Sequence, residues 1–243
     1  MAIFLTSSPS GSYRNSDIKG LDERNSFVKN LRKVWIPGRK GVIVSSDPDA
    51  FKMNDEMKAF FEQAFCDAGV PVTEFEVWDN RREDFSYERM EGSSIVMLAG
   101  GHVPTQNAFF KRIGLKETIQ KYSGVILGVS AGTMNSAKVV YAQPELPGES
   151  TDPCYERFLE GLGLTDIMVL PHYQEVREMV LDGKQVIADI TVADSYGHKF
   201  LALVDGSYLM ISDGVTRLYG EAYRISDGGI VQICRENESM VLE

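Results

Sequence analysis

The sequence predicts an α/β protein with a mostly parallel sheet, helices on both faces and antiparallel hairpins near the C-terminus. Over the first two-thirds of the chain, short apolar runs alternate with amphipathic segments, the order that produces parallel strands. The last third has short strand-like segments separated by Asp-Gly and Gly-Gly pairs, which are hairpin signals. The 243 residues contain no linker or internal repeat, so a single domain over residues 1–243 is expected.

Five apolar runs are expected to form the parallel strands. The first lies at the N-terminus, which lacks the basic start and the long apolar region of a signal peptide. The others are β-branched, alternating or fully apolar runs that end in turn-rich segments. The five runs span residues 2–5, 40–46, 72–78, 94–99 and 124–127.

Helices are expected between these strands. Residues 53–68 carry apolar side chains at helical spacing, and Gly69 follows where a helix end is typical. Residues 106–121 and 133–139 are also expected to be helical, and parts of 175–193 to form a further helix. In the last third, residues 167–170 are expected to be a strand, and hairpin turns are expected at Asp205-Gly206, Asp213-Gly214 and Asp227-Gly228-Gly229.

Charge and cysteine content narrow the class of protein. The formal net charge of −10 argues against a nucleic-acid binder, which needs a basic face. No apolar run is long enough to span a bilayer. Three widely spaced cysteines indicate neither a disulfide framework nor a zinc site, so a cytoplasmic location and no metal are expected.

The most informative motif is Gly128-Val129-Ser130-Ala131-Gly132, a G-x-S-x-G pentapeptide. It follows a buried apolar run and precedes an expected helix. In such an elbow the serine hydroxyl is raised above the sheet, and the flanking glycines let strand and helix approach closely. The amide of Ala131 would point at a developing oxyanion. Ser130 is therefore predicted to be a nucleophile.

Three histidines are candidates for its base. His172 follows the 167–170 run, so it is expected at the same sheet edge as Ser130. His102 follows Gly100-Gly101, whose backbone is better suited to oxyanion binding. His198 lies in a polar turn and is expected to be solvated. The orienting carboxylate could be any of the acidic residues between Ser130 and His172, namely Glu145, Glu149 or Asp152.

The motifs together resemble the peptidase E and cyanophycinase family of serine peptidases. The resemblance lies in residues 124–132, in Gly100-Gly101, in Pro171-His172-Tyr173 and in the segment 203–209. It implies a fold similar to class I glutamine amidotransferases, with serine in place of the catalytic cysteine, and no cofactor. The 42 residues from Ser130 to His172 also separate the chain from the α/β-hydrolases, in which the histidine follows the last strand.

Carried over to this chain, the family pattern makes Ser130 the nucleophile and His172 the general base. It places the acid between them, where Glu145 has the matching offset and Glu149 is the second choice. The oxyanion donors would be the amides of Gly101 and Ala131. The substrate is expected to contact Gly100, His102 and Gln106.

Two departures from the family pattern concern the substrate. His102 stands where an asparagine is common, and the arginine-rich stretch after the histidine, which binds an N-terminal aspartate, is missing; only Arg177 and Lys184 are nearby. The sequence therefore predicts a monomeric or homodimeric peptidase of short peptides, and it does not decide whether Asp-X selectivity is kept. The alternatives are an esterase or other small-amide hydrolase, and a non-catalytic binding module on the same fold.

Overall fold

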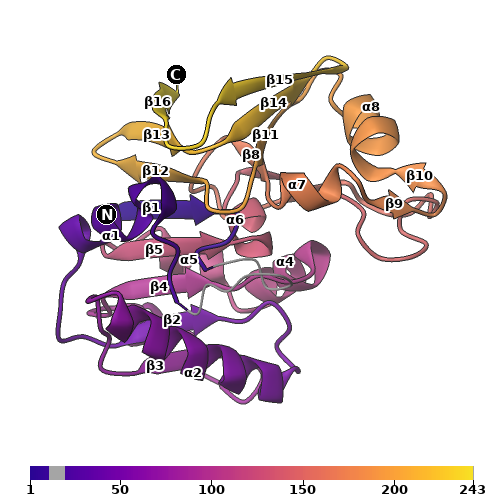
Figure 1. Ribbon diagram of the computed structural model, residues 1–243. Coiled ribbons are helices and arrows are strands. Elements are labelled where there is room, and N and C mark those ends of the chain that lie inside the picture. Colours follow the sequence, from indigo (N-terminus) through magenta and orange to yellow (C-terminus); the bar gives the residue numbers. More distant parts are fainter. Residues whose placement is uncertain (11–19, 243) are drawn as a thin grey trace.

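The largest element of the structure is an eight-stranded mixed sheet (Figure 1). The computed structural model describes residues 1–10 and 20–242. Its strands, in spatial order, are β16 (Ser239–Leu242), β13 (Val215–Tyr219), β12 (Tyr208–Ser212), β1 (Ala2–Thr6), β5 (Val125–Val129), β4 (Ile95–Leu98), β2 (Gly41–Val44) and β3 (Phe75–Trp78). The five strands from β1 to β3 are parallel, whereas β12, β13 and β16 extend the sheet in antiparallel fashion. The five predicted strands and the mixed α/β architecture are confirmed.

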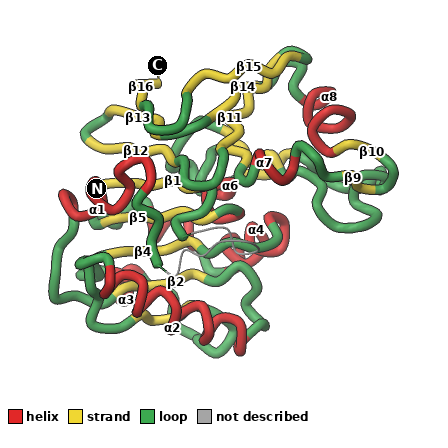
Figure 2. The backbone as a smooth tube through the Cα atoms, in the orientation of Figure 1, coloured by secondary structure: helices red, strands yellow, loops and turns green. Residues whose placement is uncertain are grey.

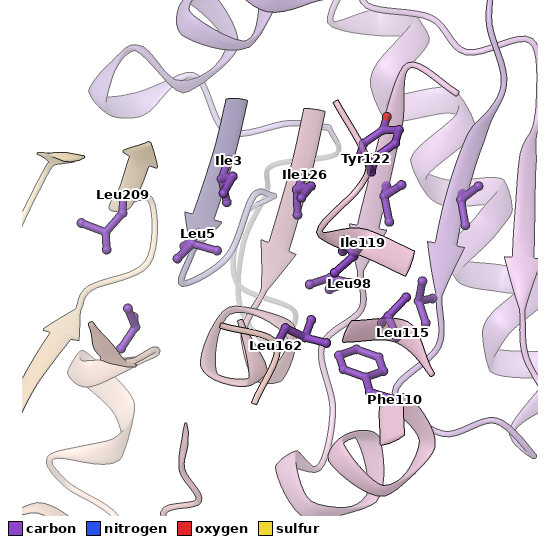
Figure 3. Close-up of a cluster of buried hydrophobic side chains, with 14 of the residues drawn as sticks. Ile3, Leu5, Leu98, Phe110, Leu115, Ile119, Tyr122, Ile126, Leu162 and Leu209 are labelled. Carbon is purple, nitrogen blue, oxygen red and sulfur yellow. The ribbon is translucent and has the colours of Figure 1, made fainter. Parts of the chain in front are cut away.

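Helices cover both faces of the parallel half, because its strands are apolar on both sides. In β1, Ile3 and Leu5 pack with one cluster of buried side chains, and Phe4 packs with another. The Ile3 cluster, partly drawn in Figure 3, includes residues of α3 (Tyr87–Met90), α4 (Val103–Arg112) and α5 (Leu115–Ile119). The Phe4 cluster is covered by α1 (Phe27–Val34), which follows the 3₁₀ turn η1 (Arg24–Ser26), and by α2 (Phe51–Asp67).

The remaining C-terminal strands form a second sheet. In spatial order it contains β15 (Gly229–Cys234), β14 (Ala222–Ser226), β11 (Lys199–Leu203) and β8 (Met168–Leu170). The expectation that the strand before His172 shares the parallel sheet of Ser130 is therefore wrong, because β8 pairs with β11 instead. Two short hairpin-like pairs complete the described strands, β6 (Val139–Tyr141) with β7 (Phe158–Glu160) and β9 (Val180–Leu181) with β10 (Lys184–Gln185).

Two of the three expected hairpin turns are hairpins. Asp213-Gly214 joins β12 to β13 and Asp227-Gly228 joins β14 to β15, with positive φ at all four residues, as tight two-residue turns require. Asp205-Gly206 is different. It connects β11 to β12, which belong to different sheets, so this turn carries the chain from one sheet to the other.

Three expected helices differ from the prediction. The segment 106–121 is divided into α4 and α5 at Gly114, whose φ is 61°, a conformation that ends a helix. The segment 133–139 begins earlier, as α6 (Ala131–Asn135), and then becomes β6. The segment 175–193 contains α7 (Tyr173–Val176), the β9–β10 pair, η2 (Val186–Thr191) and α8 (Val192–Asp194).

Two neighbourhoods consist largely of loop. No helix or strand lies in the described residues between β6 and β7, and Figure 2 shows loop backbone around β9 and β10. Among the helices of the described residues, none is both long and apolar enough to cross a membrane.

Candidate active site

Ser130 occupies the sharp turn between β5 and α6. Its backbone angles are φ 49° and ψ −110°, outside the regions favoured by L-residues. The N–H of Ser130 donates to the carbonyl oxygen of Thr6 at 3.2 Å, and the hydroxyl of Thr133 donates to the same oxygen at 2.8 Å. The turn is thus held by the end of the neighbouring strand β1, and the elbow predicted from the pentapeptide is present.

The glycines of the motif allow the close packing that the elbow needs. A methyl group on Gly132 would collide with the carbonyl oxygen of Leu98 in β4, and one on Gly128 would collide with Thr133. Gly100 lies against the elbow, since a Cβ there would be 3.3 Å from Cβ of Ser130. The end of β4 and the start of α6 therefore meet directly at Ser130.

His172 joins Ser130 to a carboxylate. Its Nε2 is 2.9 Å from Oγ of Ser130, and its Nδ1 is 2.8 Å from Oδ1 of Asp205. The imidazole is partly accessible, with 31% of the side chain exposed, whereas only 7% of the Asp205 side chain is exposed. An open imidazole edge backed by a buried carboxylate is the arrangement in which a histidine can take a proton from a serine.

The identity of this carboxylate corrects the sequence-based expectation of Glu145. Glu145 Oε1 accepts a hydrogen bond from the backbone N–H of Val103 at 3.2 Å, while Asp205 occupies the Nδ1 side of the imidazole. Asp205 follows His172 in the chain, outside the interval in which the family pattern places the acid. Its signal in the sequence is its place after the apolar run of β11, although Asp205-Gly206 by itself predicts a hairpin turn.

The electrostatic surroundings keep Asp205 ionised. Burial acts to raise the pKa of its carboxyl group, but the hydrogen bond and charge of His172 and the hydrogen bond from Ser7 outweigh burial, so the pKa lies below the usual aspartate value. A proton on Nδ1 is the natural donor to this carboxylate, which leaves the lone pair of Nε2 directed at Ser130.

Glu145, Glu149 and His102 form a second polar group beside this arrangement. Nε2 of His102 is 2.8 Å from Oε1 of Glu149, whose other oxygen accepts the backbone N–H groups of Glu145 and Leu146. Glu145 is close enough to His102 and His172 for their charges to interact. Burial raises the pKa of Glu145 and outweighs the hydrogen bond from Val103, which lowers it, so the pKa lies above its usual value.

Three other predicted site residues, Gly101, Gln106 and Asp152, lie in different surroundings. Gly101 is packed so closely that a side chain there would collide with the Ser46 hydroxyl, which itself donates to the Gly100 carbonyl at 2.6 Å. Gln106 is fully buried, and its amide is bonded to the Ala99 carbonyl and to Asn135. The expectation that Gln106 contacts substrate is therefore wrong. Asp152 caps its own turn, at 2.8 Å from the N–H of Cys154.

No group of three or more His, Cys, Asp or Glu side chains within residues 1–10 and 20–242 is arranged to hold a metal ion.

Comparisons with known proteins agree with this architecture. Residues 41–219 match the model of peptidase family S51. Among solved structures, a peptidase from an acI-B1 actinobacterium is similar with a TM-score of 0.63 and 17% identity, over 99% of this chain and 96% of that one. A proposed peptidase E from Listeria monocytogenes has a TM-score of 0.51 and 16% identity, over 96% and 97% of the two chains. No curated protein matches in sequence.

The backbone of Ser130 gives a stability prediction. Alanine at this position keeps the unfavourable φ and ψ, whereas glycine tolerates them. We expect Ser130→Gly to be more stable than Ser130→Ala by about 1 kcal/mol, after the greater chain entropy of unfolded glycine is allowed for. Urea denaturation of both variants measures the difference, and an alanine variant that is equally or more stable would show that the turn is relaxed.

The raised pKa of Glu145 gives a pH-dependent prediction. Because the unfolded chain ionises this carboxyl at lower pH than the folded protein does, the group lowers the free energy of unfolding as pH rises from the ordinary glutamate pKa through the folded value. Glu145→Gln should therefore be more stable than the parent at neutral pH. The free energies of unfolding of the variant and the parent should become similar at pH values below the ordinary glutamate pKa. Thermal melting across this range tests the sign, and a variant that is less stable at neutral pH would contradict it.

Proposed function

Because the chain belongs to peptidase family S51 and is a serine peptidase, we propose that it hydrolyses short peptides through an acyl-enzyme on Ser130. The resemblance drawn from the motifs is confirmed at the level of the family. The observation that carries the proposal is the continuous set of contacts from Ser130 Oγ through the His172 ring to Asp205, at 2.9 and 2.8 Å.

In the proposed reaction His172 Nε2 takes the hydroxyl proton as Ser130 Oγ bonds to the carbonyl carbon of the peptide. Asp205 holds the imidazole in the reactive tautomer and stabilises its positive charge. The backbone amides of Gly101 and Ala131 are proposed to bind the oxyanion. Collapse of the tetrahedral intermediate breaks the C–N bond, and His172 gives its proton to the leaving amine. Water then deacylates Ser130 by the same route.

The size of the substrate is inferred from the loop next to the site. The β6–β7 connection is held against the start of α4, because Glu145 bonds the Val103 amide and Glu149 bonds the His102 ring. His102 and Val103 follow Gly100, which lies against Ser130, so this contact is close to the proposed nucleophile. We infer that it favours short peptides over extended chains. A dipeptidase or short-peptide peptidase is the proposed class.

The charge of the substrate is inferred from the same residues. Glu145 lies close enough to His172 for their charges to interact, and Glu149 lies beside Glu145. Arg177, a basic residue close to His172 in sequence, pairs with Glu178 at 3.0 Å. A substrate carboxylate at the acyl position would meet the negative charge of Glu145 and Glu149. The proposal is therefore a preference for neutral or basic side chains at this position.

Replacing Ser130 tests the nucleophile. Ser130→Ala should lower peptide hydrolysis at least about 10³-fold and remove labelling by a fluorophosphonate, in which Oγ bonds to phosphorus and fluoride leaves. Ser136→Ala is the matched control, since that buried hydroxyl donates to the Gly132 carbonyl within the same turn of helix. A panel of acyl esters measured beside the peptides separates a peptidase from an esterase. Undiminished hydrolysis by the Ser130 variant would exclude this serine as nucleophile.

A library of short peptides that differ only in the acyl-side residue tests the charge preference. Aspartyl and glutamyl peptides should have a kcat/KM about tenfold or more below that of alanyl or lysyl peptides, as expected for one unfavourable charge contact. Glu145→Gln should reduce the difference in kcat/KM between the acidic peptides and the alanyl or lysyl peptides. Preferential cleavage of aspartyl peptides by the parent protein would contradict the proposed specificity.

A further inference from the structure

Ser7 contacts both the proposed base and the proposed acid. It directly follows β1 and its side chain is completely buried. Its Oγ accepts the backbone N–H of His172 at 2.7 Å and donates to Oδ1 of Asp205 at 2.6 Å. The same carboxylate oxygen receives Nδ1 of His172. One hydroxyl group therefore joins the main chain of the histidine to the carboxylate that faces its ring.

The direction of these hydrogen bonds is fixed by the groups involved. A backbone N–H can only donate, so the Ser7 oxygen is the acceptor of the His172 amide. A hydroxyl has a single proton, which is then free to be donated to the carboxylate. Both bonds are made at the same time without competition. A serine at this position thus satisfies the two partners in a way that alanine cannot.

The His172 backbone needs such support. Its φ of 56° and ψ of 33° are left-handed, an uncommon conformation for a residue with a side chain. Ser7 is itself fixed, because its N–H donates to the Ser207 carbonyl at 3.2 Å, two residues beyond Asp205. The hydroxyl therefore holds His172 and Asp205 in register from the end of a central strand.

We propose that Ser7 is a positioning residue of the reaction, which aligns His172 and Asp205 so that Nε2 reaches Ser130. The proposal rests on the proposed function. Ser7 touches neither substrate nor the reacting atoms, and its effect is exerted through its two hydrogen-bonded partners.

The rate of fluorophosphonate labelling of Ser130 tests this role without a known substrate. Ser7→Ala should label about 10- to 100-fold more slowly than the parent, the usual effect of losing a hydrogen bond to a charged group. Ser7→Thr retains the hydroxyl and should recover most of the rate. Ser8→Ala is the matched control, because that neighbouring buried serine donates to the Ser10 carbonyl instead. It should label at the parent rate.

Combining Ser7→Ala with Asp205→Asn separates a positioning role of the Ser7 hydroxyl from an effect of Ser7 on packing. If Ser7 acts through the carboxylate, Ser7→Ala should slow labelling much less when Asp205→Asn is already present. Circular dichroism and melting confirm that each variant compared is folded. Should Ser7→Ala fail to fold, Ser7→Cys, which offers a weaker donor of similar size, should show an intermediate rate.

The outcomes are distinct. Equal labelling rates for Ser7→Ala and the parent, or an equally slow Ser7→Thr, would overturn the role of the Ser7 hydroxyl and leave the proposed function intact. An undiminished effect in the Asp205→Asn background would also overturn it. If the parent protein itself is not labelled, the proposed function fails, and the role of Ser7 fails with it.

Discussion

The carboxyl end of β1 is the point on which the candidate site depends. Thr6 holds the elbow, because its carbonyl oxygen accepts both the Ser130 N–H and the Thr133 hydroxyl. The next residue, Ser7, holds His172 and Asp205. A central strand buried on both faces is among the most rigid parts of such a fold. Thr6, the last residue of β1, and Ser7, which follows it, thus fix the distance between serine and histidine.

This constraint explains how two sheets can share one site. Ser130 is carried by the main sheet, whereas His172 follows β8 in the second sheet. Asp205 lies on the connection by which the chain passes from β11 in the second sheet to β12 in the main one. The proposed base and acid are therefore placed where the two sheets meet, and the hydroxyl of Ser7 spans that junction. Residues far apart in sequence are aligned without any of them needing a long flexible side chain.

The sequence predicted the parts of the structure that depend on local pattern. The apolar runs predict the parallel strands, because a strand buried on both faces needs apolar side chains. The glycines around Ser130 predict the elbow, because the close approach of strand and helix leaves no room for side chains there. The proposed acid, Asp205, could not be predicted in this way. Asp205-Gly206 is the same dipeptide as Asp213-Gly214, and the sequence does not reveal that β11 and β12 belong to different sheets. The position of Gln106 differs from the prediction for a related reason, since its side chain is buried and accepts a hydrogen bond from Asn135 of α6, which is distant in sequence.

Asp205, rather than Glu145, is the residue proposed to support His172 in catalysis. The most direct measurement compares kcat/KM of Asp205→Asn and Glu145→Gln on one good neutral peptide, with folding checked by circular dichroism. The Asp205 variant should lose about 10³- to 10⁴-fold, the effect of removing the carboxylate from such a triad. The Glu145 variant should stay within about tenfold of the parent. A large loss in Glu145→Gln with near-normal activity in Asp205→Asn would contradict this assignment.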